Sequence, residues 1–393
     1  MKSITTAALA AISLLCAFLA LRPPSSGAAV EIAARPVWTP ERLPALLAEA
    51  QGTADLERAV DELLAQSGTR TCLAVYEGER PVLLRRPERQ LIPASTQKTL
   101  VATAALAALG PDFRYETRVL SDAGPRDGAV GTLWLVGSGD PTLASPEYIT
   151  FLSERPRFQL HLATPLTALA DGLKAAGVTT VTGGIVGDES RYDRTRILPG
   201  WKASYVIDNE VGPLSALLVN GGFTVFQPSQ AAPAAGVRGT HPVPRAEKRA
   251  DDPAAHAASE LSRLATAAGI TVAGPARSGA APPEGAVTLA TVRSAPLSDI
   301  VAGMLRESDN TAAELLVREI GVAKRRDGST PAGTHAIADA LAEAGLPTAG
   351  LRLGDGSGLE VTNQSNCTLL AAALRKPDRG GAPELSPLLA VAG

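Results

Sequence analysis

The segment Pro93-Ala94-Ser95-Thr96-Gln97-Lys98 places a serine and a lysine three residues apart. The run from Ser95 to Ala108 is rich in Ala, Leu and Thr and is followed by Gly110, which predicts a helix with Ser95 in its first turn and Gly110 as its carboxyl-terminal cap. One helical turn brings Ser95 and Lys98 onto the same face. Partial burial, or the positive end of the helix dipole, would lower the pKa of Lys98, so that its amine can act as the base for the Ser95 hydroxyl.

A serine that caps the helix beside a surface lysine would give the same pattern. However, Lys98 is the only lysine of the chain with a serine three positions before it. A second polar segment, Ser308-Asp309-Asn310, lies between predicted helices at Leu297–Arg306 and Thr311–Ile320. One of its residues could simply cap the second helix. Together, the two segments match two of the three motifs of the penicillin-recognising serine enzymes.

Five segments carry a wider resemblance. They are Pro93-Ala94-Ser95-Thr96-Gln97-Lys98, Leu135-Val136-Gly137-Ser138-Gly139-Asp140-Pro141-Thr142-Leu143, Val211-Gly212-Pro213-Leu214-Ser215-Ala216, Glu307-Ser308-Asp309-Asn310 and Asp355-Gly356-Ser357-Gly358-Leu359. In these segments the chain resembles the class C penicillin-binding proteins of low molecular mass, the D-alanyl-D-alanine carboxypeptidase/endopeptidase family, over nearly all its length. The resemblance implies an α/β (α+β) fold: a transpeptidase/β-lactamase-like domain with a β-rich insertion between the first two motifs. The wide gap between those motifs argues against a class A β-lactamase.

The resemblance also implies roles for individual residues. Ser95 would attack the carbonyl of the penultimate D-alanine, Lys98 would accept its proton, and Ser308 would relay a proton to the leaving D-alanine. Asn310 would bind the substrate's peptide amide, and the Ser95 backbone N–H would form half of the oxyanion hole. The implied partners are peptidoglycan stem peptides ending in D-Ala-D-Ala, and β-lactams as acylating inhibitors. Asp309 is expected to be structural.

Two short β-prone runs on either side of Glu77-Gly78-Glu79 predict a hairpin. Strand-like runs such as Ala216–Phe226, separated by Gly, Asp and Pro turns, begin near Tyr115. A helix is expected over Ala254–Ala268, and a turn rich in Gly and Asp at 354–358. We expect four segments in all. They are a signal peptide at 1–29, the first part of the transpeptidase-like domain at 30–114, the inserted β-rich region at 115–284 and the second part of the domain at 285–393. Within the insertion, the acidic segment 187–193 is either a surface turn or a receptor for the amino end of a stem peptide. Asp188 is its best candidate for substrate binding.

Lys2, an apolar run from Ala7 to Leu21 and the small residues Ser26-Gly27-Ala28 have the layout of a signal peptide. The run would make a helix of roughly 22 Å, shorter than the ~30 Å hydrocarbon core, which favours cleavage over an uncleaved anchor. Either outcome places the domain outside the cytoplasm. There, Cys72 and Cys367 could form one disulfide or remain two buried thiols.

With 45% hydrophobic and 20% charged residues, the chain can bury a sizeable core. The net charge of −3 is dispersed, which gives no indication of nucleic-acid binding. The four histidines are scattered and lack metal-ligand spacing, so we expect neither a metal nor another cofactor. The oligomeric state is left open.

The third motif, Lys-Thr-Gly, is absent: Lys98-Thr99 is followed by Leu100. In the family this motif lies beyond the Asp355–Leu359 region, and the end of this chain resembles the segment just before it. We therefore expect the sequence to be incomplete at its carboxyl end, and the 393-residue polypeptide alone to be inactive. The alternative is a non-catalytic cell-wall-binding or scaffold protein. A β-lactamase-like hydrolase is a third possibility.

Overall fold

The computed structural model describes residues 43–67, 70–154, 162–227, 245–279, 285–375 and 384–389. The expected signal peptide at 1–29 lies outside these ranges. By its contacts the chain divides into two compact units, residues 1–59 and 60–393. The described part of the first unit belongs to helix α2, and the features below lie in the second. No helix of the described ranges is long and apolar enough to cross a membrane.

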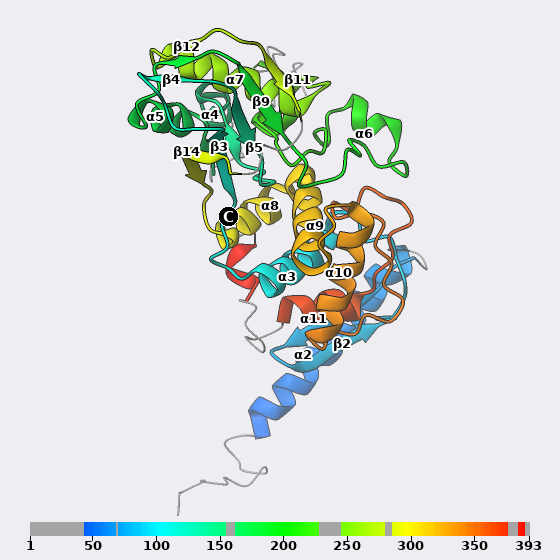
Figure 1. Ribbon diagram of the computed structural model, residues 1–393. Helices are drawn as coiled ribbons and strands as arrows, with labels where there is room; N and C mark the ends of the chain where they lie inside the picture. Colours follow the sequence, from blue (N-terminus) through cyan, green and yellow to red (C-terminus); the bar gives the residue numbers. More distant parts are fainter. Residues whose placement is uncertain are drawn as a thin grey trace, which may run out of the picture. The chain divides into compact units, whose positions relative to one another are not determined.

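The helices and strands follow one another as Figure 1 shows. The helices are α2 (Leu43–Ser67), α3 (Lys98–Leu109), α4 (Pro146–Ser153), α5 (Thr167–Ala175), α6 (Ala203–Ile207), α7 (Pro253–Ala267), α8 (Leu297–Glu307), α9 (Asn310–Arg325), α10 (Thr330–Glu343) and α11 (Cys367–Arg375), with short 3-10 helices at Ala94–Gln97, Asn220–Gly222 and Ser386–Leu388. The strands are β1 (Leu73–Glu77), β2 (Arg80–Arg85), β3 (Glu116–Ser121), β4 (Ala129–Val130), β5 (Leu133–Val136), β6 (Leu143–Ala144), β7 (Thr164–Pro165), β8 (Thr180–Val181), β9 (Ile185–Asp188), β10 (Phe223–Gln227), β11 (Arg245–Arg249), β12 (Thr271–Val272), β13 (Ala276–Ser278) and β14 (Val287–Arg293).

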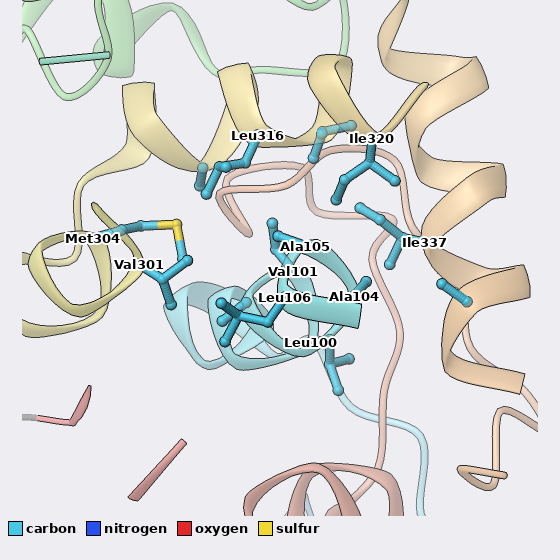
Figure 2. Packing of buried hydrophobic residues seen from close by; sticks show 14 of the residues in the cluster. Leu100, Val101, Ala104, Ala105, Leu106, Val301, Met304, Leu316, Ile320 and Ile337 are labelled. Carbon is cyan, nitrogen blue, oxygen red and sulfur yellow. The ribbon is translucent and has the colours of Figure 1, made fainter. Parts of the chain in front are cut away.

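Helix α3 is the centre of one hydrophobic core. It is apolar on all sides, as expected of a helix buried among others. Figure 2 shows its side chains packed against those of α8, α9 and α10. The labelled residues are Leu100, Val101, Ala104, Ala105 and Leu106 of α3, Val301 and Met304 of α8, Leu316 and Ile320 of α9, and Ile337 of α10. Burial on every side fixes the position of the amino-terminal end of α3.

A second core belongs to a five-stranded sheet of order β13-β9-β5-β3-β14. Strand β9 is parallel to both β13 and β5, whereas β3 pairs antiparallel with both β5 and β14. Helices α5 and α7 pack on this sheet. Its edge strand β14 (Val287–Arg293) follows residue 284, which was the expected end of the insertion. The boundaries of the four expected segments stay a prediction.

Several local predictions are confirmed. The expected hairpin around Gly78 is the antiparallel pair β1 and β2, Gly110 caps α3 with φ 85°, and the break between α8 and α9 falls at Ser308-Asp309. The strand expected over Ala216–Phe226 is wrong in its first half. There Asn220, Gly221 and Gly222 all have positive φ, which ends any extended run before β10.

Cys72 and Cys367 form a disulfide across 295 residues of sequence, which decides between the two alternatives left open by the sequence. The bond ties the segment before β1 to the first residue of α11, and α11 also contacts β1 and α3. The hairpin is therefore attached to the helical core that carries α3.

Candidate active site

Ser95 and Lys98 lie at the amino-terminal end of α3, as the sequence predicts. Ser95 belongs to a 3-10 turn, Ala94–Gln97, and α3 begins at Lys98. Ser95 is exposed, whereas Lys98 is 1% exposed. The Lys98 Nζ lies 3.1 Å from the Ser95 Oγ. The turn thus presents a hydroxyl to solvent with an amine directly behind it.

The Lys98 amine has three acceptors. Besides Ser95 Oγ, it donates to Asn310 Oδ1 at 2.7 Å and to the Ser357 carbonyl at 2.8 Å. Burial lowers the pKa of Lys98 to about 8, although the carboxylates of Asp309, Glu314 and Asp355 oppose this by attraction. The amine can therefore lose its proton near neutral pH, which an exposed lysine does not do.

The break between α8 and α9 brings Asn310 to Lys98. The Asp309 carboxylate caps α9 by accepting from the Ala312 N–H at 3.0 Å, which confirms its structural role. Asn310 is then the first residue of the helix, and its Nδ2 donates to the Glu210 carbonyl at 2.7 Å. Ser308 is exposed in the left-handed conformation, φ 56°. Among the described residues, no hydrogen bond joins its side chain to Lys98.

The turn 355–358 packs against the Ser95 turn from a distant part of the sequence. Gln97 donates to the Asp355 carbonyl at 2.6 Å, and the Ser357 carbonyl accepts from Lys98. Gly358 has φ +86°, and a Cβ there would overlap the Ala94 carbonyl. Only glycine fits both the conformation and this close approach.

The Asp355 carboxylate accepts six hydrogen bonds. Its Oδ1 accepts from Gln97 Nε2, the Gly358 N–H and Asn363 Nδ2, and its Oδ2 accepts from Trp201 Nε1, Ser357 Oγ and the Glu360 N–H. Asp355 is fully buried. The carboxylate therefore fixes the turn to both the α3 end and Trp201, a residue of the region inserted between the two motifs.

Two further contacts bring the Trp201 region to the site. Asn310 donates to the carbonyl of Glu210, and the Gly212 N–H donates to Thr311 Oγ1 at 2.8 Å. Trp201 itself packs in a small apolar cluster with Leu198, Val211 and Leu214. The segment from 201 to 212 is thus part of the site's surroundings.

Asp188 stands apart from this cluster in its contacts. It is the last residue of β9, is 2% exposed, and accepts from the Ser190 N–H at 2.8 Å. Among the described residues, no hydrogen bond or ion pair joins Asp188 to Ser95, Lys98 or Asn310. Its role in substrate binding stays a prediction.

Sequence reasoning assigned no role to Gln97, Glu314 or Asp355, all of which surround Lys98. Glu314 lies four residues after Asn310, on the same face of the mostly buried helix α9. This spacing from a motif residue was the one sequence signal that could have indicated that Glu314 lies near the site. The contacts of Asp355 join segments more than 150 residues apart, and spacing along the sequence does not predict these. The described residues contain no group of His, Cys, Asp and Glu that could hold a metal ion.

Comparisons with known proteins show the family to which the chain belongs. A family model described as D-Ala-D-Ala carboxypeptidase 3 (S13) matches residues 56–246 and 237–393. A carboxypeptidase of Mycobacterium tuberculosis is 31% identical over 303 residues, covering 76% of this chain and 58% of the relative. A D-alanyl-D-alanine carboxypeptidase of Actinomadura sp. is 29% identical over 328 residues, covering 70% and 58%. The chain thus spans about 58% of the length of these relatives.

Among solved structures, penicillin binding protein 4 from Haemophilus influenzae is similar, with a TM-score of 0.61 and 23% sequence identity. The match covers 75% of this chain and 72% of that chain. This similarity confirms the fold class expected from the sequence.

Proposed function

Because the chain belongs to the D-Ala-D-Ala carboxypeptidase 3 (S13) family, we propose that it is part of a serine-type D-Ala-D-Ala carboxypeptidase/endopeptidase that acts on peptidoglycan stem peptides. The observation that carries the proposal is the buried Lys98 amine, 3.1 Å from the exposed Ser95 hydroxyl. This pair has the composition and distance of a nucleophile with its general base.

The reaction would start at Ser95. Its oxygen attacks the carbonyl carbon of the penultimate D-alanine while its proton passes to the neutral Lys98 amine. The C–N bond to the terminal D-alanine then breaks, and that nitrogen receives a proton from Lys98 through Ser308. Water hydrolyses the resulting ester, which frees Ser95. A β-lactam would form the same ester bond with Ser95.

Asn310 and the backbone would hold the substrate. The Asn310 amide uses its oxygen for Lys98 and one N–H for the Glu210 carbonyl, which leaves its second N–H for the peptide of the substrate. The Ser95 N–H lies in the turn that leads into α3, where the helix dipole favours negative charge, so it suits an oxyanion donor.

We place this activity outside the cytoplasm. The substrate is part of the cell wall, and the Cys72–Cys367 disulfide is of the kind that persists in oxidising compartments. The signal peptide expected from the sequence at 1–29 would direct the protein to this location.

The test is release of D-alanine from a peptide ending in D-Ala-D-Ala by the protein expressed from its complete reading frame. We expect release by the wild type, none by Ser95→Ala, and a rate reduced by about 10²-fold in Ser308→Ala if this hydroxyl relays the proton. Release that persists in Ser95→Ala would overturn the proposal. Absence of release from the wild type would favour the non-catalytic scaffold.

A further inference from the structure

Glu314 is a buried carboxylate that the proposed reaction does not use. It is fully buried in α9, four residues after Asn310. Its Oε1 accepts from the Gly356 N–H at 3.0 Å and from the Ser357 N–H at 2.7 Å. Its Oε2 is buried and has no hydrogen-bond partner among the described residues. Burying a carboxylate costs free energy unless the group is fully paired and hydrogen-bonded. A role for Glu314 in holding the surroundings of Lys98 would account for this cost.

The contacts form a short chain from Glu314 to the nucleophile. Glu314 holds the Ser357 N–H, and the carbonyl of the same residue accepts from Lys98 Nζ at 2.8 Å. Lys98 in turn donates to Ser95 Oγ. A shift of Ser357 would therefore move one of the three acceptors that fix the amine, which is a direct route from Glu314 to the geometry of Ser95.

Charge gives Glu314 a second connection to Lys98. The charged groups around it are Asp355 in the adjoining turn, Arg318 one turn further along α9, and Lys98 at the end of α3. Burial raises the pKa of Glu314 to about 7, and repulsion by Asp355 adds to this rise, whereas the two N–H donors lower it. Arg318 forms an ion pair with Asp193, 3.1 Å away.

We infer that Glu314 is a positioning residue of the Ser95 site, which holds the Gly356–Ser357 backbone against Lys98 and whose buried charge acts on the Lys98 amine together with that of Asp309. This inference rests on the proposed function for its catalytic consequence. The geometric and electrostatic parts can be separated, because glutamine keeps the Oε1 acceptor and removes the charge, whereas alanine removes both.

The experiment follows the ε-methylene signal of Lys98 by NMR in protein labelled with ¹³C-lysine, and Lys98→Arg assigns the signal. We expect a titration near pH 8 in the wild type, because burial sets the pKa of Lys98 there. In Glu314→Gln, the midpoint should move to lower pH, because Glu314 raises the pKa of Lys98. An unchanged midpoint, or a move to higher pH, would overturn the inference.

Glu319→Gln is the matched control. Glu319 is a buried carboxylate on the same helix, but it binds Arg191 and Tyr192 instead of the turn. This variant should lose stability without moving the Lys98 midpoint. An equal shift in Glu319→Gln would show a general effect of buried charge and would contradict a specific role for Glu314.

Rates of acylation by penicillin add the catalytic readout. Relative to its own plateau, Glu314→Gln should reach half-maximal rate at lower pH than the wild type. Glu314→Ala should lower the plateau by about 10²-fold through displacement of the amine. A plateau equal to wild type in a folded Glu314→Ala would refute the positioning role. If the wild type is not acylated at all, the proposed function fails, and the NMR titration still decides whether Glu314 controls Lys98.

Discussion

The surroundings of Lys98 lower the pKa of its amine and hold the amine in place, as the proposed role of a general base requires. The amine is buried but every proton of its ammonium form has an acceptor, in Ser95, Asn310 and Ser357. Desolvation lowers its proton affinity, whereas the acceptors keep it in place. The sequence predicted the Ser95–Lys98 pair from a spacing of three residues. It could not predict the burial, because that depends on α9 and the 355–358 turn.

The pKa of Lys98 predicts the pH dependence of acylation. With the neutral Lys98 amine as the proposed base, the acylation rate should fall about tenfold per pH unit below pH 8 and level off above it. Stopped-flow acylation with a fluorescent penicillin measures this directly. Lys98→Met should abolish acylation, while Lys174→Met, which replaces an exposed lysine of α5, should leave the profile unchanged. A rate independent of pH between 6 and 9 would contradict Lys98 as the base.

The expected role of Asp188 in substrate binding can be tested with peptides that differ at their amino end. If it receives the amino end of the stem peptide, Asp188→Asn should raise KM for a peptide with a free amino group and leave penicillin acylation unchanged. An acetylated peptide serves as the control, since it carries no charge for the carboxylate to bind. Equal effects on both peptides would assign Asp188 to the turn in which it binds the Ser190 N–H.

At the level of helices, strands and turns, sequence patterns predicted several elements but not the tertiary contacts of the turn 355–358. Helix α7 was predicted within one residue of its observed bounds, whereas α9 was predicted to start at Thr311 but continues past the expected end at Ile320 to Arg325. Helices α4, α6 and α11 were missed: α4 and α6 are short, and Asn366, whose side chain accepts from the Leu369 N–H at 2.9 Å, was not recognised as the N-cap of α11. The turn was recognised as rich in Gly and Asp, but its contacts with Gln97 and Lys98 depend on tertiary packing.

Gly358→Ala tests the contact between this turn and the Ser95 turn. The new Cβ would overlap the Ala94 carbonyl at a positive φ, so we expect a loss of more than about 2 kcal/mol in the free energy of unfolding, together with loss of acylation. Gly345→Ala is the control, because Gly345 has φ +75° with open space around its Cβ position. It should cost about 1 kcal/mol and leave acylation intact.

Urea denaturation measures both variants. Equal stability losses for Gly358→Ala and Gly345→Ala, with acylation retained in both, would show that the close approach of Gly358 to Ala94 does not matter for the site.

At the scale of the whole molecule, the site combines four regions of the sequence: the Ser95 turn, the start of α9, the turn 355–358 and the segment 201–212. The motifs indicated the first two regions and the resemblance marked the third. The fourth lies within the expected insertion. The resemblance marked its end at Val211-Gly212, but the hydrogen bonds of Trp201 and Glu210 were not predicted. Hydrogen bonds between residues so far apart follow from the fold and leave no periodic signal in the sequence.

The contribution of the Cys72–Cys367 disulfide to the stability of the whole molecule can also be tested. It closes a loop of 295 residues in sequence separation, so replacing both cysteines by serine should lower the free energy of unfolding by about 2–4 kcal/mol. Urea denaturation with and without reductant gives the measurement. Reductant should destabilise the wild type to the level of the double variant and leave the variant unchanged. Equal stability of wild type and variant without reductant would contradict a stabilising bond.

We propose Ser95 as the nucleophile of an acyl-transfer site. Its most direct test is mass spectrometry of the protein, expressed from its complete reading frame, after incubation with benzylpenicillin at pH 8. We predict one covalent penicilloyl adduct, located on Ser95 by peptide mapping and absent from Ser95→Ala. An adduct on another residue, an adduct that persists in Ser95→Ala, or a wild type that forms none would contradict the account.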